Sequence, residues 1–101
     1  MTESGPREDE LKELVARGFQ AECSYVNPWA FKKVLAAFRD GDELAVWVWK
    51  SYPDGLIRVD ISSAPYEQTA LVAASMELEK LLPTVDGLIR VISAAPREGD
   101  L

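Results

Sequence analysis

The chain has 101 residues, of which 48% are hydrophobic and 28% charged, and its formal net charge is −6 at pH 7. These values are typical of one globular domain, residues 1–101, and the negative charge disfavours nucleic acid as a partner because phosphates need a basic surface. Histidine is absent and Cys23 is the single cysteine, which excludes imidazole catalysis, Ser–His or Cys–His nucleophiles, and metal sites made of histidines or several thiolates. We therefore expect a non-enzyme that uses no cofactor or metal.

The same features suggest where the protein works. No apolar run is long enough to span a bilayer, and the first residues are polar and acidic, unlike a signal or transit peptide. A lone cysteine fits a reducing compartment. We expect a cytoplasmic protein that does not enter membranes.

The first expected elements are a helix over residues 6–17 and a strand over residues 19–26. Pro6 suits the first turn of a helix, acidic residues follow it, and Gly18 ends the helix. Residues 19–26 then alternate between apolar and polar side chains, which is typical of a half-buried strand.

A second helix is expected from Asn27-Pro28 to about residue 39, because a capping residue followed by proline is a strong helix start. Residues 43–51 have high β propensity and predict a strand, and the Tyr52-Pro53-Asp54-Gly55 turn leads into its hairpin partner. A third helix is expected from Pro65 to Leu82, and a last strand over residues 87–93. Residues 97–101 are expected to form a loose tail.

A hexapeptide repeat supports the two later strands. Asp-Gly-Leu-Ile-Arg-Val occurs at residues 54–59 and again at residues 86–91. An Asp-Gly turn that leads into β-branched apolar residues is a common way to begin a strand. The repeat therefore predicts two strands with similar structural roles.

This order of elements resembles the ferredoxin-like fold over residues 19–94. That resemblance implies an α+β, two-layer βαββαβ sandwich, with an antiparallel sheet in the order 4-1-3-2 and the N-terminal helix as an addition. Only the order of elements carries the resemblance, and the fold by itself selects no function.

The register of the 43–61 hairpin decides which side chains are buried. If Tyr52 pairs with Leu56, Trp49 lies opposite Val59 and Trp47 opposite Ile61. Both tryptophans then belong to the core, together with the apolar residues of the partner strand. A slip of one residue would turn them outward.

Three sets of residues are candidate sites. Trp29 falls on the polar side of its expected helix. There an exposed indole would either anchor a partner or form a cation–π contact with Lys33, one turn later. Val72 and Met76 lie off the main stripe of the third helix, where they either pack against the first helix or extend that surface. The partner-binding patch is expected to contain Trp29, Lys33, Val72 and Met76.

The second set is an open apolar sheet face. On the expected register, Val46, Val48, Leu88 and Ile92 lie on the side of the sheet away from the helices. Pairing two copies would remove that face from water, so we expect a homodimer.

The third set is a cluster of cations. The 4-1-3-2 order would place Glu22 between Arg58 and Arg90, with Lys50 beside Arg58. Such a group is either a cross-strand ladder of charges or a small-anion site made of Lys50, Arg58 and Arg90.

The sequence thus favours a small acidic non-catalytic protein that binds another protein, as an inhibitor, adaptor or regulator, and that self-associates. One alternative is a single-stranded nucleic-acid binder with a sheet face carrying Trp47 and Trp49. The other is a small-anion-sensing regulatory module.

Overall fold

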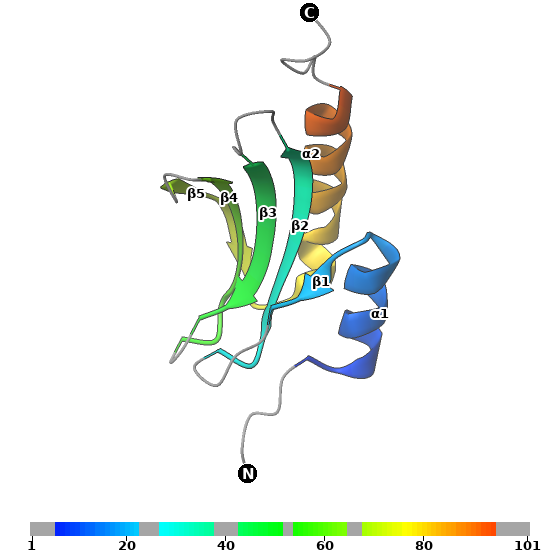
Figure 1. Cartoon of the computed structure of the whole chain (residues 1–101). Helices are drawn as coiled ribbons and strands as arrows, with labels where there is room; N and C mark the ends of the chain where they lie inside the picture. The colour runs from blue at the N-terminus through cyan, green and yellow to red at the C-terminus, as the bar shows by residue number, and fades with distance from the viewer. Residues whose placement is uncertain (1–5, 23–26, 38–42, 52–53, 65–67, 95–101) are drawn as a thin grey trace, which may run out of the picture.

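The computed structural model describes residues 6–22, 27–37, 43–51, 54–64 and 68–94. These residues form a five-stranded antiparallel sheet and two α-helices (Figure 1). The elements in chain order are α1 (Glu8–Ala16), β1 (Gln20–Ala21), β2 (Ala30–Ala37), β3 (Glu43–Lys50), β4 (Ile57–Ala64), β5 (Gln68–Ser75), a short 3₁₀ helix (Leu78–Lys80) and α2 (Leu82–Ala94). Neither helix is long and apolar enough to cross a membrane, and this holds for the described residues.

The ferredoxin-like prediction is wrong. The strands lie side by side in chain order, β1-β2-β3-β4-β5, and not in the order 4-1-3-2. Most of the second expected helix is β2, the third is β5 followed by the 3₁₀ helix, and the expected last strand lies in α2. The segments with the expected outcome are α1, β3 and β4, whereas the strand expected over residues 19–26 is described only as the two-residue β1.

The two large buried side chains of residues 30–37 have a spacing that is compatible with a strand as well as with a helix. Phe31 and Leu35 are four positions apart, a spacing that puts two side chains on one face of a helix and also on one face of a strand. A β-bulge at Leu35 adjusts the pairing, since Val34 lies opposite Ala45 and Ala36 opposite Leu44. Sequence periodicity therefore did not distinguish the two structures.

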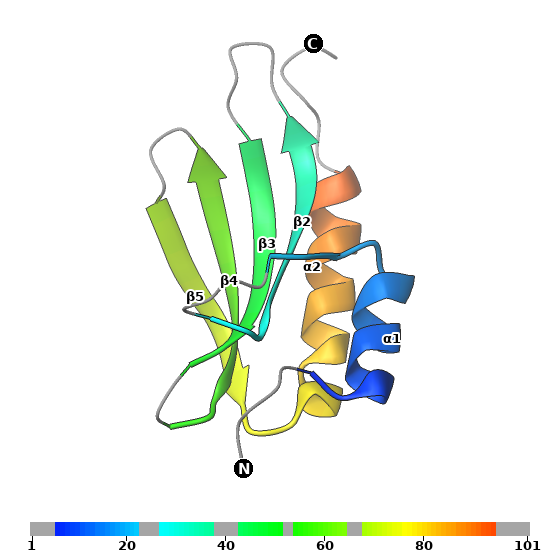
Figure 2. The ribbon, with the colours of Figure 1, turned by 60° about the horizontal axis from the view of Figure 1, so that its bottom comes forward.

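The core lies between the sheet and the two helices. Both helices lie on one side of the sheet, near β2, while β4 and β5 extend away from them (Figure 2). The buried cluster combines Phe31, Leu35, Val46, Val48, Ile57 and Val59 from the sheet with Leu14, Leu81 and Val85 from the helical segments. Leu88 and Ile89 of α2 pack against it.

The β3–β4 hairpin has a register one residue away from the expected one. Trp49 lies opposite Arg58 and Trp47 opposite Asp60. The backbone N–H of Ser51 donates to the carbonyl of Leu56 over 2.8 Å, so the loop includes one more residue than the predicted turn. Consequently Val46 and Val48 have no exposed surface and face the helices, while the two indoles face the other side.

The repeated hexapeptide adopts two different structures. In the first copy, Gly55 has a φ of 74°, a left-handed conformation that glycine adopts without a side-chain clash, and β4 follows. The second copy lies inside α2. There it continues the apolar spacing of Leu81 and Val85 with Leu88 and Ile89, a helical i, i+4, i+7, i+8 pattern that packs against the core. The neighbouring residues, rather than the six shared ones, decide the structure.

An arginine at the end of α1 joins the two helices. Arg17 donates from Nε to Oδ1 of Asp86 over 2.7 Å and from Nη2 to Oδ2 over 3.1 Å, a bidentate pair across 69 positions of sequence. Its Nη1 also donates to the Glu13 carboxylate over 2.8 Å. The hydrogen bonds from Arg17 lower the pKa of Asp86, and those to Asp86 and Glu13 raise the pKa of Arg17.

This pair predicts a pH-dependent effect of Asp86→Asn. Because folding lowers the pKa of Asp86, its stabilising effect is complete above the unfolded pKa of about 4 and is lost as the pH falls through the folded pKa. At pH 7 the variant should lose up to about 1 kcal/mol of unfolding free energy, since the carboxylate is partly exposed and screened by solvent. Urea unfolding at pH 7 and at pH 3 measures the difference. Glu79→Gln, an exposed neutralisation, is the control, and an equal loss in both variants would contradict a specific Arg17–Asp86 effect.

Candidate binding surface on the open face of the sheet

Two tryptophans occupy the side of the sheet away from the helices, which we call the open face. Across one row of the sheet, Lys32, Trp47, Asp60 and Leu71 lie opposite one another on β2, β3, β4 and β5. Across the next row lie Ala30, Trp49, Arg58 and Ala74. The open face is thus a mixed aromatic and charged surface and not the apolar face that the sequence suggested.

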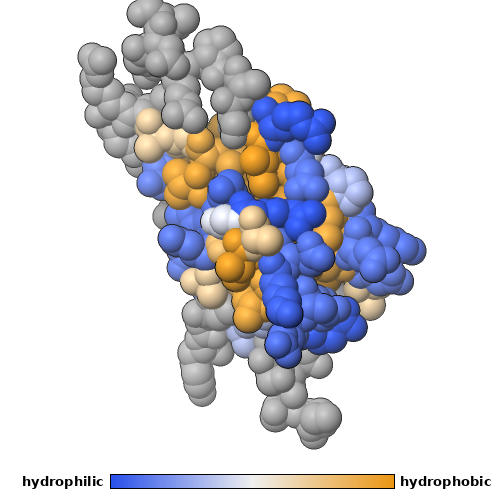
Figure 3. Space-filling view, turned by 90° about the vertical axis from the view of Figure 1, so that its right-hand side faces the viewer, coloured by the Kyte–Doolittle hydropathy of each residue, from blue (hydrophilic) through white to orange (hydrophobic). Residues whose placement is uncertain are grey.

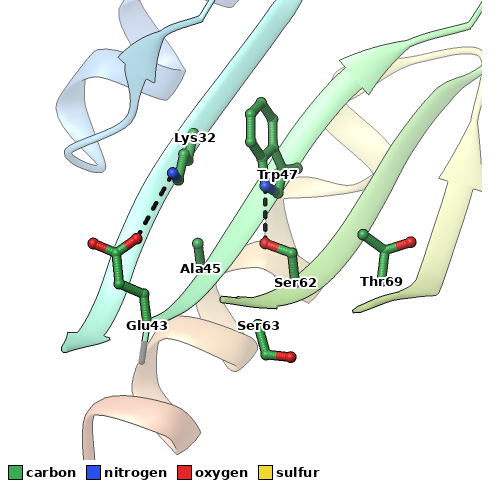
Figure 4. Close-up of a pocket in the computed structure, with 7 residues that line it drawn as sticks. All are labelled: Lys32, Glu43, Ala45, Trp47, Ser62, Ser63 and Thr69. Atoms are coloured by element: carbon green, nitrogen blue, oxygen red, sulfur yellow. Dashed lines mark hydrogen bonds and ion pairs between the residues drawn. The ribbon is translucent and has the colours of Figure 1, made fainter. Parts of the chain in front are cut away.

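Side chains of β4 hold both indoles in place. Trp47 donates its indole N–H to the Ser62 hydroxyl over 2.9 Å, and Trp49 donates to Oδ2 of Asp60 over 2.8 Å. From the opposite strand, Nζ of Lys32 lies 5.4 Å from the centroid of the Trp47 ring. Figure 4 shows Trp47 between Lys32 and Ser62. Side chains fixed in this way lose less conformational entropy when a partner binds.

Three adjoining hollows lie along this face. The first, of about 280 Å³, borders Trp47 and is lined by Lys32, Glu43, Ala45, Ser62, Ser63 and Thr69 as well (Figure 4). The second, of about 430 Å³, is lined by Glu22, Asn27, Ala30, Trp47, Trp49, Asp60 and Thr69. The third, of about 390 Å³, extends from Trp49 towards Asp54 and Leu71. Because neighbouring hollows share lining residues, they lie side by side along the open face, and we call them together the tryptophan trough.

Carboxylates outnumber cations around the tryptophan trough. Its described lining includes the acids Glu22, Glu43, Asp54 and Asp60 and the bases Lys32 and Arg58. Nζ of Lys32 lies 3.9 Å from Oε1 of Glu43, and Nη2 of Arg58 lies 3.3 Å from Oδ2 of Asp54.

Each of these two cations therefore has its own carboxylate. Within the described ranges, neither Asp60 nor Glu22 has a cation within ion-pair distance. The trough as a whole retains negative charge that no described side chain of this protein neutralises.

Local hydrogen bonds fix the Arg58 end of the trough. The Asp54 carboxylate accepts hydrogen bonds from the Ser51 hydroxyl and from the backbone N–H of Leu56. These contacts, followed by the nearby Arg58 charge, lower the pKa of Asp54. Arg58 also donates from Nε to Oγ of Ser51 over 3.2 Å. These contacts connect Ser51, Asp54 and Arg58 at this end of the trough.

The described residues bring together no group of three or more carboxylate or thiol side chains suited to a metal ion. The open face offers aromatic surface, hydroxyls and carboxylates that already hold indoles. Such an arrangement can bind a ligand by stacking and charge.

The residues of the expected partner-binding patch do not lie together. Trp29 has 0% exposed surface and meets the Phe31 ring edge-on, at a centroid separation of 5.5 Å. Lys33 is half-buried on β2, whereas Val72 and Met76 are exposed on and just beyond β5, at the far edge of the sheet. Trp29 is therefore a core residue, and it directly precedes a strand, β2, where a helix was expected. The expectation that it is exposed is wrong.

The expected dimer face is likewise part of the interior. Val46 and Val48 have 0% exposed surface, and Leu88 packs against the core from α2. Ile92 lies in α2, but its side chain is outside the described residues. The apolar area that suggested a homodimer is already covered by the protein's own helices.

The expected anion site is separated in space. Lys50 and Arg58 point to opposite faces, since Lys50 lies opposite Ile57 and Arg58 opposite Trp49. Nζ of Lys50 lies 5.7 Å from the centroid of the Trp29 ring, and Arg90 is exposed on α2. The predicted order 4-1-3-2 had placed these cations together, and the meander separates them.

Three partners of the indoles were not predicted from the sequence: Lys32, Asp60 and Ser62. A signal was present, because Arg58, Asp60 and Ser62 alternate with the apolar residues Val59 and Ile61. When every second residue of a strand is polar, those residues indicate the face of the sheet that is open to solvent. The tryptophans that pair with them on the neighbouring strand lie on the same face.

The surface that carries the helices is a less continuous candidate. Figure 3 shows hydrophobic side chains interrupted by hydrophilic ones on that side of the molecule. Leu11 and Val15 of α1 and Val91 of α2 are exposed there, at 39%, 57% and 68%. Scattered apolar side chains of this kind are common on protein surfaces.

Comparison of the chain with protein-family models, with curated proteins and with solved structures finds no match. The geometry and charge of the open face are therefore the observations that bear on function.

Proposed function

We propose that this protein is a non-catalytic binding protein that holds an extended, basic segment of another protein in the tryptophan trough. The supporting observation is that two indoles, each fixed by a hydrogen bond, border a trough with more carboxylates than cations. Aromatic side chains supply large contact areas at interfaces, and an excess of one charge favours the opposite charge on the partner. The protein would act as an inhibitor, adaptor or regulator in the cytoplasm.

Single-stranded nucleic acid is the second candidate. The outward direction of Trp47 and Trp49 favours it, because bases stack on aromatic side chains of a sheet face. The charge opposes it, since both cations of the trough already have carboxylate partners and the whole chain carries −6. We therefore rank a basic protein segment above a nucleic acid.

Selection from a random peptide library displayed on phage, with the whole chain as bait, tests the proposal. Selected peptides should be enriched in lysine and arginine beside apolar residues. Their affinity should fall at least about tenfold in Trp49→Ala, because hot-spot aromatic residues dominate such interfaces. Val91→Ala, which alters an exposed apolar residue on α2, should bind as the unmodified protein does.

Binding of a single-stranded oligothymidylate tests the nucleic-acid alternative. Salt-sensitive oligonucleotide binding that is lost in Trp49→Ala would support the nucleic-acid alternative and overturn the proposal. Peptide binding that is equal in the unmodified protein and in Trp47→Ala and Trp49→Ala would also overturn it. Amide NMR spectra of each variant show whether the fold is retained.

A further inference from the structure

The second hollow of the tryptophan trough combines aromatic and acidic groups in one place. Trp47 and Trp49 border it from β3, Asp60 from β4 and Glu22 from the segment just after β1. Ala30, opposite Trp49 on β2, contributes only a methyl group, which leaves space beside the indole. We call this hollow the central hollow.

Its two carboxylates differ from the others of the trough. Glu43 and Asp54 each meet a cation, whereas Asp60 and Glu22 meet none among the residues that the structure describes. Asp60 is half-buried and is held beside the aromatic rings by its bond with the Trp49 indole. A carboxylate in this setting gains most from a cation that arrives with the ligand, because the partly desolvated site strengthens their attraction.

The spacing of the tryptophans suits a flat cation. Successive side chains on one face of a strand are about 7 Å apart, and a planar group stacks on a ring at about 3.5–4 Å. A guanidinium group can therefore lie against an indole and still direct N–H groups at a carboxylate. Arginine fits this combination better than lysine, since its planar head stacks on aromatic rings and forms two parallel hydrogen bonds.

We propose that the central hollow binds the guanidinium group of one arginine side chain of the partner segment, stacked on Trp47 or Trp49 and paired with Asp60. This inference depends on the proposed function and names the residue that anchors the partner. A free arginine derivative would fill the same hollow more weakly, because it lacks the contacts of the neighbouring residues.

The indole N–H signals of the three tryptophans in ¹⁵N–¹H NMR spectra provide the readout, with N-acetyl-arginine amide as the probe. The Trp47 and Trp49 signals should shift and saturate, while the signal of Trp29, buried on the other face, should not move. N-acetyl-citrulline amide has the same shape without the charge and should bind at least about tenfold more weakly. The lysine analogue should fall between the two.

Asp60→Asn is the decisive variant, because it removes the charge and keeps an oxygen that can accept the Trp49 indole. It should abolish the preference for arginine over citrulline, whereas Glu79→Gln, an equal charge change on the 3₁₀ helix, should preserve it. Equal binding of arginine and citrulline, or an unchanged preference in Asp60→Asn, would overturn the inference.

The two proposals can fail separately. If library peptides bind through Trp49 but lose no affinity when each arginine is replaced by citrulline, the arginine site is wrong and the proposed function remains. If arginine amide binds but no library peptide does, the proposed function is wrong, and the hollow is a site for a small cation only, which overturns its role as a partner's anchor.

Discussion

Trp29→Ala should lower the free energy of unfolding by about 3–5 kcal/mol, the usual range for the loss of a buried aromatic side chain. Trp29 has no exposed surface, contacts the Phe31 ring edge-on and lies under the Lys50 ammonium group. Its removal leaves a large cavity at the start of β2. Chemical denaturation followed by far-ultraviolet circular dichroism measures the change without relying on tryptophan fluorescence.

Two variants separate packing from polarity at this position. The Trp29 indole N–H has no acceptor among the described residues, so Trp29→Phe removes no hydrogen bond there. The loss of unfolding free energy in Trp29→Phe should therefore be less than half of the loss in Trp29→Ala. Trp49→Ala, on the half-buried open face, should cost clearly less than Trp29→Ala. An equal or smaller cost for Trp29→Ala would contradict its place in the core.

Val59→Ala and Val91→Ala should have opposite consequences, although both alter the last residue of the same hexapeptide. Val59 is fully buried on β4, and its truncation should cost about 1.5–3 kcal/mol. Val91 is 68% exposed on α2, where alanine is the better helix former, so that variant should gain about 0.5 kcal/mol or stay unchanged. Denaturation midpoints at equal m-values compare the two.

The unmodified chain supplies the baseline for this pair, and each variant controls for the other, since residue type and hexapeptide context are identical. Similar losses at both positions would mean that Val91 is packed as Val59 is, which would contradict the exposure of Val91 on α2. Helical content by circular dichroism should stay constant in Val91→Ala.

The sequence signals that worked were local. Pro6, the acids after it and Gly18 bound α1 closely, and the β-branched and tryptophan residues of 43–50 made β3 unambiguous. Two of the signals that failed involved alanine-rich segments, residues 30–37 and 68–75. Residues 68–75 contain three alanines, which favour helices in isolation, and only pairing with β4 makes them a strand.

The hexapeptide shows why tertiary context was needed. In the first copy, which is a strand, the side chains of Ile57 and Val59 lie on the buried face of β4. In the second copy, which is helical, Leu88 and Ile89 lie with Val85 on the face of α2 that packs against the core. Six residues satisfy both patterns, and the sequence alone could not choose between them. The open face depended on an equally small difference, since one additional loop residue between Ser51 and Leu56 exchanged Trp47 and Trp49 for Val46 and Val48 in the core.

The order of the strands also determines the sequence separation between the segments that must meet during folding. Every strand pairs only with its neighbours in sequence, so each step of sheet formation closes a short loop. Such closures have a low entropic cost, and chains rich in them fold faster than chains whose strands come from distant segments. The Arg17–Asp86 contact joins positions 69 residues apart, and its formation brings α1 and α2 together over a sheet that short-range steps can build first.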